Sequence, residues 1–248
     1  MEHKEYISEI PGCHTAVLFI HGIAGSPNQF SFIAESFRGR CSTYNILLDG
    51  HGSDVLAFGK SSMAKWISQV LSAVSSLEKR YDNILLFGHS MGCLLAAEAL
   101  FLHPQKIKGM IWLAPPLKIF VRPKAVLNSY KIRFGCVQPD DAVGNAGIIC
   151  NSIGKHRSVF EYLTWLPRYL ELFAESRKIR RSMDKITVPT TVFLSRNDEL
   201  VSIQSSRYLQ ENPFIELKEL SLSGHFYYMQ EEKKHILAKT DALLKGLL

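Results

Sequence analysis

A serine framed by two glycines, between a strand-like and a helix-like segment, constrains this chain more than any other feature. Residues 88–92 read Gly-His-Ser-Met-Gly, with Ser90 at the centre. The apolar segment 83–87 predicts a strand and the segment 93–100 predicts a helix. A serine on such a sharp turn is held in strained backbone geometry, and its neighbours must be small so that strand and helix can approach closely. The turn predicts a nucleophilic hydroxyl at a helix N-terminus, where backbone N–H groups favour negative charge.

The rest of the chain alternates in the same way. Apolar runs predict strands at residues 15–20, 43–48, 83–87, 107–113, 190–195 and 214–220. Periodic segments between them predict helices at residues 27–38, 61–80, 91–102, 202–211 and 230–247. This alternation implies an α/β fold with a mostly parallel sheet covered by helices on both faces. A chain of 248 residues, of which 46% are hydrophobic, is expected to form one domain over residues 1–248.

Segment 115–185 interrupts the alternation and is too long for a simple connection, so we expect a helical cap over the strand ends. It carries 13 basic and 6 acidic residues, a net charge of +7, against +6 for the whole chain. One predicted helical face consists of Phe160, Leu163, Leu166, Leu170 and Phe173. The sequence allows two interpretations of this segment. Either the face is ordinary core and the charges are solvated, or the face covers an acyl pocket and the basic rim meets anionic lipid.

The sequence gives little support for secretion, membrane insertion, metal binding or nucleic-acid binding. The N-terminal residues do not resemble a signal peptide, and no apolar run approaches the length of a transmembrane helix. The five cysteines are scattered and show no metal-ligand spacing. We therefore expect a reduced, cytoplasmic protein. No groove-reading or aromatic-interleaved motif accompanies the basic segment, so nucleic-acid binding is not expected.

A serine nucleophile needs a base and an acid that orients the base, in the chain order Ser, acid, His. Four histidines follow Ser90 in the sequence. His103 is too close to the turn in sequence, His156 falls in the cap, and His235 lies on a charged helix face. His225 directly follows the last predicted strand, at the edge where the carboxyl ends of parallel strands meet. We predict that His225 is the base.

Two adjacent carboxylates, Asp198 and Glu199, follow the strand predicted at 190–195. Asp198 is favoured because apolar packing resumes at Leu200 and Val201, and because a short side chain is oriented more rigidly. Glu199 is then expected to be a solvated residue at a helix start. Either carboxylate satisfies the logic of a triad.

Two backbone N–H groups are needed to stabilise a developing oxyanion. One is expected from Met91, the residue after the nucleophile, and the other from Ile23, in the turn after the strand at 15–20. We interpret His21, in the same turn, as a hydrogen-bonding strut. His51 is also expected to be structural, because a base upstream of the nucleophile would break the expected order.

Together these pieces resemble an α/β-hydrolase, and most closely its bacterial carboxylesterase and monoacylglycerol lipase branch. The matching motifs are His21-Gly22 with Gly25, Asp49-Gly50-His51-Gly52-Ser53, Gly88-His89-Ser90-Met91-Gly92, Asp198 with Leu200-Val201, and Ser223-Gly224-His225. The resemblance implies hydrolysis of a small-molecule ester, with acylglycerols among the candidates, through a covalent acyl-enzyme and without a metal or cofactor. Thioester, peptide or carbon–carbon hydrolysis and acyl transfer on the same triad remain open, as does a non-catalytic binding protein of the same fold.

Overall fold

Seven strands form one mixed sheet at the centre of the molecule. The computed structural model describes residues 2–154 and 160–247, so His156 lies outside the described residues. The strands are β1 (Tyr6–Ser8), β2 (Thr15–Ile20), β3 (Ser42–Ile46), β4 (Asn83–His89), β5 (Ile107–Leu113), β6 (Thr190–Ser195) and β7 (Ile215–Leu220). Their order is β1-β3-β2-β4-β5-β6-β7, and only β1 pairs antiparallel with its neighbour. The predicted α/β fold with a mostly parallel sheet is confirmed.

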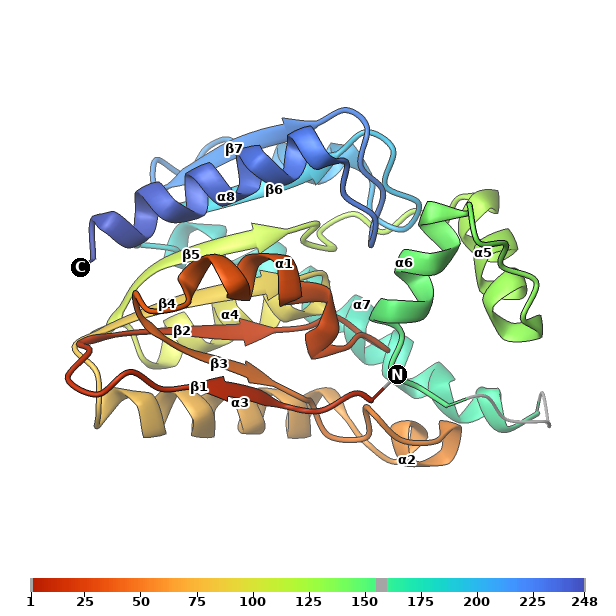
Figure 1. The fold of residues 1–248 in the computed structure, drawn as a ribbon, viewed down its shortest axis with the longest axis horizontal. Coiled ribbons are helices and arrows are strands. Elements are labelled where there is room, and N and C mark those ends of the chain that lie inside the picture. Colours follow the sequence, from red (N-terminus) through yellow and green to blue (C-terminus); the bar gives the residue numbers. More distant parts are fainter. Residues whose placement is uncertain (1, 155–159, 248) are drawn as a thin grey trace.

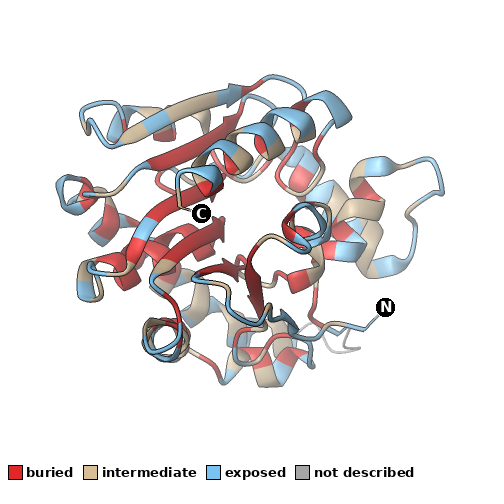
Figure 2. Cartoon of the chain, turned by 60° about the vertical axis from the view of Figure 1, so that its left-hand side comes forward, coloured by how far each residue is buried: buried red, intermediate tan, exposed pale blue. Residues whose placement is uncertain are grey.

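The sheet is buried on both faces because alternate side chains of each strand enter different cores. On β2, Leu18 joins the core beneath α3 (Met63–Glu78) and α4 (Met91–Leu102). Its neighbours Val17 and Phe19 join the core on the other face, beneath α1 (Ser31–Ala34) and α8 (Gln230–Lys245). Figure 1 shows these two helical layers, and Figure 2 shows burial concentrated in the strands between them.

The segment between β5 and β6, here called the interrupting segment, starts at the carboxyl ends of the parallel strands and then runs back to the opposite edge of the sheet, where β6 begins (Figure 1). It contains α5 (Pro123–Phe134), α6 (Ala142–Cys150), the 3-10 helices η3 (Phe160–Trp165) and η4 (Met183–Lys185), and α7 (Leu166–Arg180). The arrowheads of β2, β5 and β7 point toward the side where α5 and α6 lie (Figure 1). Residues that directly follow these strands therefore face the same edge of the sheet as the interrupting segment.

Several predicted elements differ in detail. The helix predicted at 27–38 forms three short pieces: η1 (Pro27–Phe30), α1 and η2 (Glu35–Phe37). The helix predicted at 202–211 forms as the shorter 3-10 helix η5 (Ile203–Tyr208). Its serines favour caps and turns over helix interiors. Strand β1 and the short helix α2 (Val55–Gly59) were not predicted. Within the described ranges, no helix has the length and apolar character needed to cross a membrane.

The apolar face expected on the interrupting segment is exposed. The exposed fraction falls from 82% at Phe160 to 48% at Phe173, and Leu163, Leu166 and Leu170 lie between these values. Its interpretation as ordinary core is therefore wrong.

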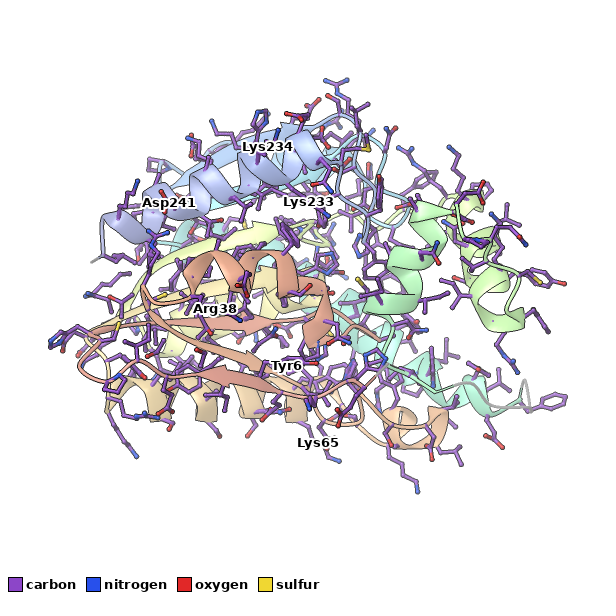
Figure 3. The ribbon with its side chains drawn as sticks, viewed as in Figure 1. Tyr6, Arg38, Lys65, Lys233, Lys234 and Asp241 are labelled. Atoms are coloured by element: carbon purple, nitrogen blue, oxygen red, sulfur yellow. The ribbon has the colours of Figure 1, made fainter. Side chains whose placement is uncertain are left out.

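Outside the interrupting segment, charged side chains such as Arg38, Lys65 and Lys234 project from separate places on the surface (Figure 3). Each of these three has an acidic partner within 3.5 Å.

Candidate active site

Ser90 occupies the strained turn that the sequence predicts. It lies between β4 and α4 with φ 52° and ψ −121°, a backbone conformation that non-glycine residues rarely adopt. Its N–H donates to the carbonyl of Leu113 at 2.8 Å, and its carbonyl accepts from Cys93 at 2.9 Å. A Cβ atom added to Gly88 would lie 2.7 Å from the nitrogen of Cys93, so the strand and helix approach too closely for a side chain there.

His225 and Asp198 form a buried pair. The Nδ1–H of His225 donates to Asp198 Oδ2 at 2.8 Å, and the two side chains are only 4% and 1% exposed. Asp198 follows β6 and His225 follows β7, so parallel pairing of these strands brings together residues 27 positions apart in sequence. A carboxylate bonded to Nδ1 leaves Nε2 as the nitrogen able to accept a proton.

The surroundings of Asp198 keep its carboxylate ionised. Burial by itself would raise the pKa of Asp198, but the His225 charge and hydrogen bond and two backbone N–H groups act against it. These N–H groups, from Leu200 and Val201, each donate to Oδ1 at 2.8 Å. The net result is a pKa below the usual value. Asp198 can therefore orient His225 and stabilise its protonated form.

Glu199 does not lie in solvent, and this expectation is wrong. Its side chain is buried, and Oε2 accepts the backbone N–H of His225 at 2.7 Å. The two neighbouring carboxylates thus bind different parts of one histidine, Asp198 the ring and Glu199 the main chain. The sequence identified both acids but assigned a role to only one.

Ser90 and His225 lie at the same edge of the sheet, connected through His89. The Nε2–H of His89 donates to the carbonyl of His225 at 2.9 Å, and the two rings lie 4.7 Å apart. Burial lowers the pKa of His89 to about 3, so its ring is neutral. Among the described residues, no hydrogen bond joins the Ser90 hydroxyl to the His225 ring. In ligand-free enzymes such a bond is often long and tightens when substrate binds.

The turn expected to supply an oxyanion donor lies against Ser90. A Cβ atom added to Gly22 would lie 2.9 Å from the Cβ of Ser90, which places the next residue, Ile23, beside the nucleophile. The turn is closed by Gly25, whose N–H donates to the carbonyl of Gly22 at 2.9 Å. Ser152, at the end of α6, donates from its N–H to the carbonyl of Ala24 at 3.1 Å. A residue of the interrupting segment thus supports the turn, a contact that sequence spacing does not reveal.

His21 and His51 are structural, as the sequence predicts. His21 donates from Nδ1 to the carbonyl of Gly22 at 2.9 Å and accepts the N–H of Leu48 on Nε2 at 3.0 Å. His51 Nδ1 bonds the carbonyls of Leu48 and Asp49, both at 3.2 Å. Burial lowers the pKa of His51 to about 4. Both rings are therefore neutral struts.

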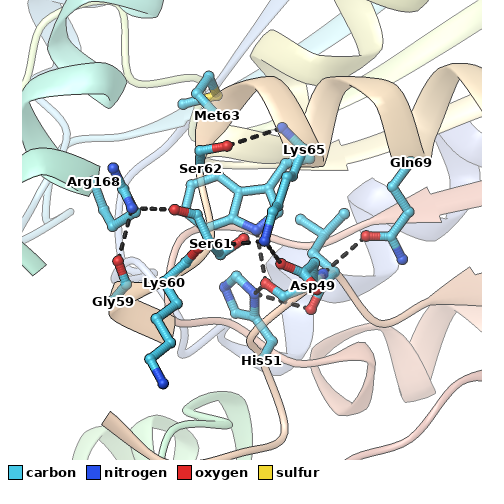
Figure 4. Close-up of polar contacts among 12 residues, drawn as sticks. Asp49, His51, Gly59, Lys60, Ser61, Ser62, Met63, Lys65, Gln69 and Arg168 are labelled. Atoms are coloured by element: carbon cyan, nitrogen blue, oxygen red, sulfur yellow. Dashed lines mark hydrogen bonds and ion pairs between the residues drawn. The ribbon is translucent and has the colours of Figure 1, made fainter. Parts of the chain in front are cut away.

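The connection from β3 to α3, which contains His51 and α2, is also bound to the interrupting segment. Figure 4 shows Gln69 accepting from the backbone of Asp49, at 2.8 Å, while Arg168 bonds the carbonyls of Gly59 and Ser61. Since Arg168 belongs to α7, the interrupting segment is anchored to this loop.

The family described as serine aminopeptidase, S33, matches residues 13–229. The chain belongs to this family. As an S33 α/β-hydrolase, it has the architecture and the arrangement of strand ends described above.

Relatives of this S33 hydrolase carry esterase and lipase names. The monoglyceride lipase homolog of Monkeypox virus is 23% identical over 94% of this chain and 86% of its own length. Putative esterase/lipase 3 of Mycoplasma pneumoniae is 23% identical over 77% of this chain and 71% of its own. A solved structure described under the metagenome-derived lipolytic enzymes LipS and LipT superposes with a TM-score of 0.74 and 20% identity, covering 99% and 98% of the two chains. These findings support a hydrolase of the esterase and lipase type.

Proposed function

We propose that this chain is a serine hydrolase that cleaves carboxylic esters, with Ser90 as nucleophile, His225 as base and Asp198 as the orienting acid. The observation that carries the proposal is the buried Asp198–His225 pair, whose hydrogen bond is 2.8 Å long, at the sheet edge that also holds Ser90. A base oriented in this way beside a serine on a strand-to-helix turn is the combination that acyl transfer requires.

The proposed reaction has two halves. Ser90 Oγ forms a bond to the ester carbonyl carbon while its proton passes to Nε2 of His225. The amides of Ile23 and Met91 stabilise the oxyanion. Collapse breaks the bond to the alcohol, which takes the proton from His225 and leaves an acyl-serine. Water then attacks the acyl-serine with His225 as base, releasing the carboxylic acid and restoring Ser90.

Monoacylglycerols are the substrate class we propose first. The monoglyceride lipase homolog among the relatives supports this choice, and so do the large exposed apolar side chains of the segment that borders the site. The family description favours peptide bonds as the alternative. Thioesters, carbon–carbon bonds and acyl transfer are further alternatives, since the same triad can serve all of these reactions.

Labelling with a fluorophosphonate probe, followed by a substrate panel, tests the proposal. We expect wild-type protein to be labelled and Ser90→Ala not to be. The Ala variant should also lose about 10⁵-fold to 10⁶-fold in kcat, because it removes the hydroxyl that His225 is proposed to activate. The panel contains p-nitrophenyl esters, monoacylglycerols, an acyl thioester and an aminoacyl anilide. Labelling of Ser90→Ala would reject the nucleophile, and faster turnover of the anilide than of any ester would reject the substrate class.

We also propose that the interrupting segment rests on anionic lipid. Its charge is +7, and its exposed apolar side chains include Phe160, Leu163 and Leu166. Apolar side chains that enter the lipid together with basic residues near an anionic surface are typical of interfacial binding. A cytoplasmic location, as expected from the cysteines, is part of the same proposal.

A further inference from the structure

Side chains from α8 and from the connection that follows β6 hold the loop that carries His225. Glu232, on α8, accepts the N–H groups of Ser221 at 2.6 Å and Ser223 at 2.8 Å. Asn197 donates to the carbonyl of Ser221 at 2.7 Å. Glu199 makes the last of these contacts, directly to the N–H of His225 at 2.7 Å.

The contact made by Glu199 requires a glycine before the histidine. A Cβ atom added to Gly224 would lie 2.8 Å from Oε1 and 3.0 Å from Oε2 of Glu199. Carbon-to-oxygen distances this short are repulsive, so any side chain at position 224 would displace the carboxylate. The Glu199 carboxylate can therefore reach the His225 N–H only because residue 224 has no side chain.

The backbone of Glu199 is itself held in place. Its carbonyl accepts the N–H of Arg122 at 2.8 Å, and its side chain is buried. The next two residues, Leu200 and Val201, donate their N–H groups to Asp198. Glu199 thus extends from a rigid turn, and its carboxylate can transmit that rigidity to the His225 main chain.

We propose that Glu199 is a positioning residue that holds the backbone of His225 while Asp198 holds its ring. The inference rests on the proposed function, because positioning has a kinetic meaning only if His225 acts as the base. Asp198 contacts one ring nitrogen and does not hold the main chain of His225. His89 binds the carbonyl of His225, and Glu199 binds its N–H. Glu199 thus fixes the side of the peptide backbone that His89 does not reach, so Nε2 stays within reach of Ser90.

Two substitutions separate the hydrogen bond from the carboxylate charge. Glu199→Ala removes the acceptor, and we expect kcat to fall about 10-fold to 100-fold with KM changed less than about twofold, as for displacement of a catalytic group by a fraction of an ångström. Glu199→Gln keeps an oxygen acceptor and should restore kcat to within about fivefold of wild type. Glu211→Ala, an exposed glutamate in the same connection between β6 and β7, is the control and should leave both parameters unchanged.

A double-mutant cycle tests the match between Glu199 and Gly224. Gly224→Ala alone should lower kcat because the new methyl group displaces Glu199. In the Glu199→Ala background the same change should cost less than half as much on a logarithmic scale, because the clash is gone. Additive losses, or a fall in kcat for Glu199→Gln equal to that for Glu199→Ala, would overturn the proposal.

Backbone hydrogen exchange provides a readout that does not depend on turnover. In the Ser90→Ala background, the amide of His225 should exchange at least about tenfold faster with Glu199→Ala than with Glu199 or Gln. An unchanged exchange rate of the His225 amide would overturn the role of Glu199, even if the wild-type protein is an active enzyme. If wild-type protein cleaves no acyl substrate, the proposed function fails, and the exchange experiment still decides whether Glu199 holds His225.

Discussion

At the scale of single residues, both carboxylate oxygens of Asp198 accept hydrogen bonds. One oxygen takes the Nδ1–H of His225 and the other takes two backbone N–H groups, from Leu200 and Val201. Every one of these partners is a donor. The side chain therefore has to be a carboxylate, because an amide would present its own N–H₂ group to a donor on one side or the other.

Asp198→Asn should therefore lower kcat by about 10²-fold to 10⁴-fold with little loss of fold. If the amide N–H₂ faces His225, it forces Nδ1 to accept and places the proton on Nε2, the nitrogen that must be free to act as base. Steady-state ester hydrolysis measures the effect, and circular dichroism checks the fold. Retention of wild-type kcat would show that Asp198 is not the orienting acid.

The sequence placed Ser90, Asp198 and His225 at strand ends because alternation of strands and helices makes the sheet edge predictable. It could not distinguish a solvated Glu199 from a buried one. The two carboxylates are adjacent in the chain, and only the space left by Gly224 shows where the second one goes. The role of Ser152 could not be predicted, because Ser152 and Ala24 are 128 positions apart in the sequence and no local sequence pattern indicates their contact.

At the scale of elements, the junction of α4 and α7 contains two buried carboxylates and one lysine. Glu98 belongs to α4, while Glu175 and Lys178 belong to α7. Lys178 Nζ lies 2.7 Å from Glu98 and 3.6 Å from Glu175. Burial, together with the neighbouring Glu98, raises the pKa of Glu175 to about 7. One lysine cannot neutralise both acids, so the junction favours a proton on Glu175.

A raised carboxyl pKa makes the folded state less stable as pH rises. The unfolded chain releases this proton near pH 4.5 and the folded chain near pH 7, so stability falls between these values. Glu175→Gln removes the ionisation and should stabilise the protein at pH 8 by about 1–3 kcal/mol, with most of the gain absent at pH 5. Thermal unfolding at both pH values measures this, with the exposed Glu231→Gln as control. A gain of equal size at pH 5 and pH 8 would contradict it.

The predicted helices and strands agree with the structure where the sequence pattern extends over many residues, and the prediction failed where the elements are short. The strand predicted at 107–113 is β5, because its apolar run is continuous. Strand β1 has three exposed residues, too few to show a pattern. Helix α2 has five residues and depends on Asp54, which accepts the N–H of Ala57 at 2.7 Å. Periodicity also identified the apolar face at 160–173, but it cannot say whether anything covers that face.

At the scale of the whole molecule, charge and apolar exposure gather on the segment that borders the site. If this surface meets anionic lipid, co-sedimentation with anionic vesicles should fall steeply between low and high salt. Each basic residue near such a surface contributes about 1 kcal/mol at low salt, and the screening length shrinks to about 3 Å at 1 M salt. Turnover of a small soluble ester should barely change over the same range.

Variants locate the contact on the molecule. Leu163→Ser combined with Leu166→Ser should weaken vesicle binding. Leu102→Ser, at an equally exposed position at the end of α4, should not. Equal binding to neutral and anionic vesicles, or none to either, would reject the interfacial role and leave the proposed esterase unaffected.

The interrupting segment is joined by backbone hydrogen bonds to the loops at Asp198 and Ile23, and this limits how substrate range can be re-engineered by transplanting it. Arg122 donates to the carbonyl of Glu199 at 2.8 Å, and Ser202 donates to that of Lys118 at 2.8 Å. Ser152 supports the turn at Ala24 from the other end of the segment. A chimera cut before Lys118 would exchange Lys118 and Arg122, the hydrogen-bond partners of the acid loop, along with the helices. A graft that begins after Arg122 and preserves the donor at position 152 would exchange the helices alone and leave the chemistry in place.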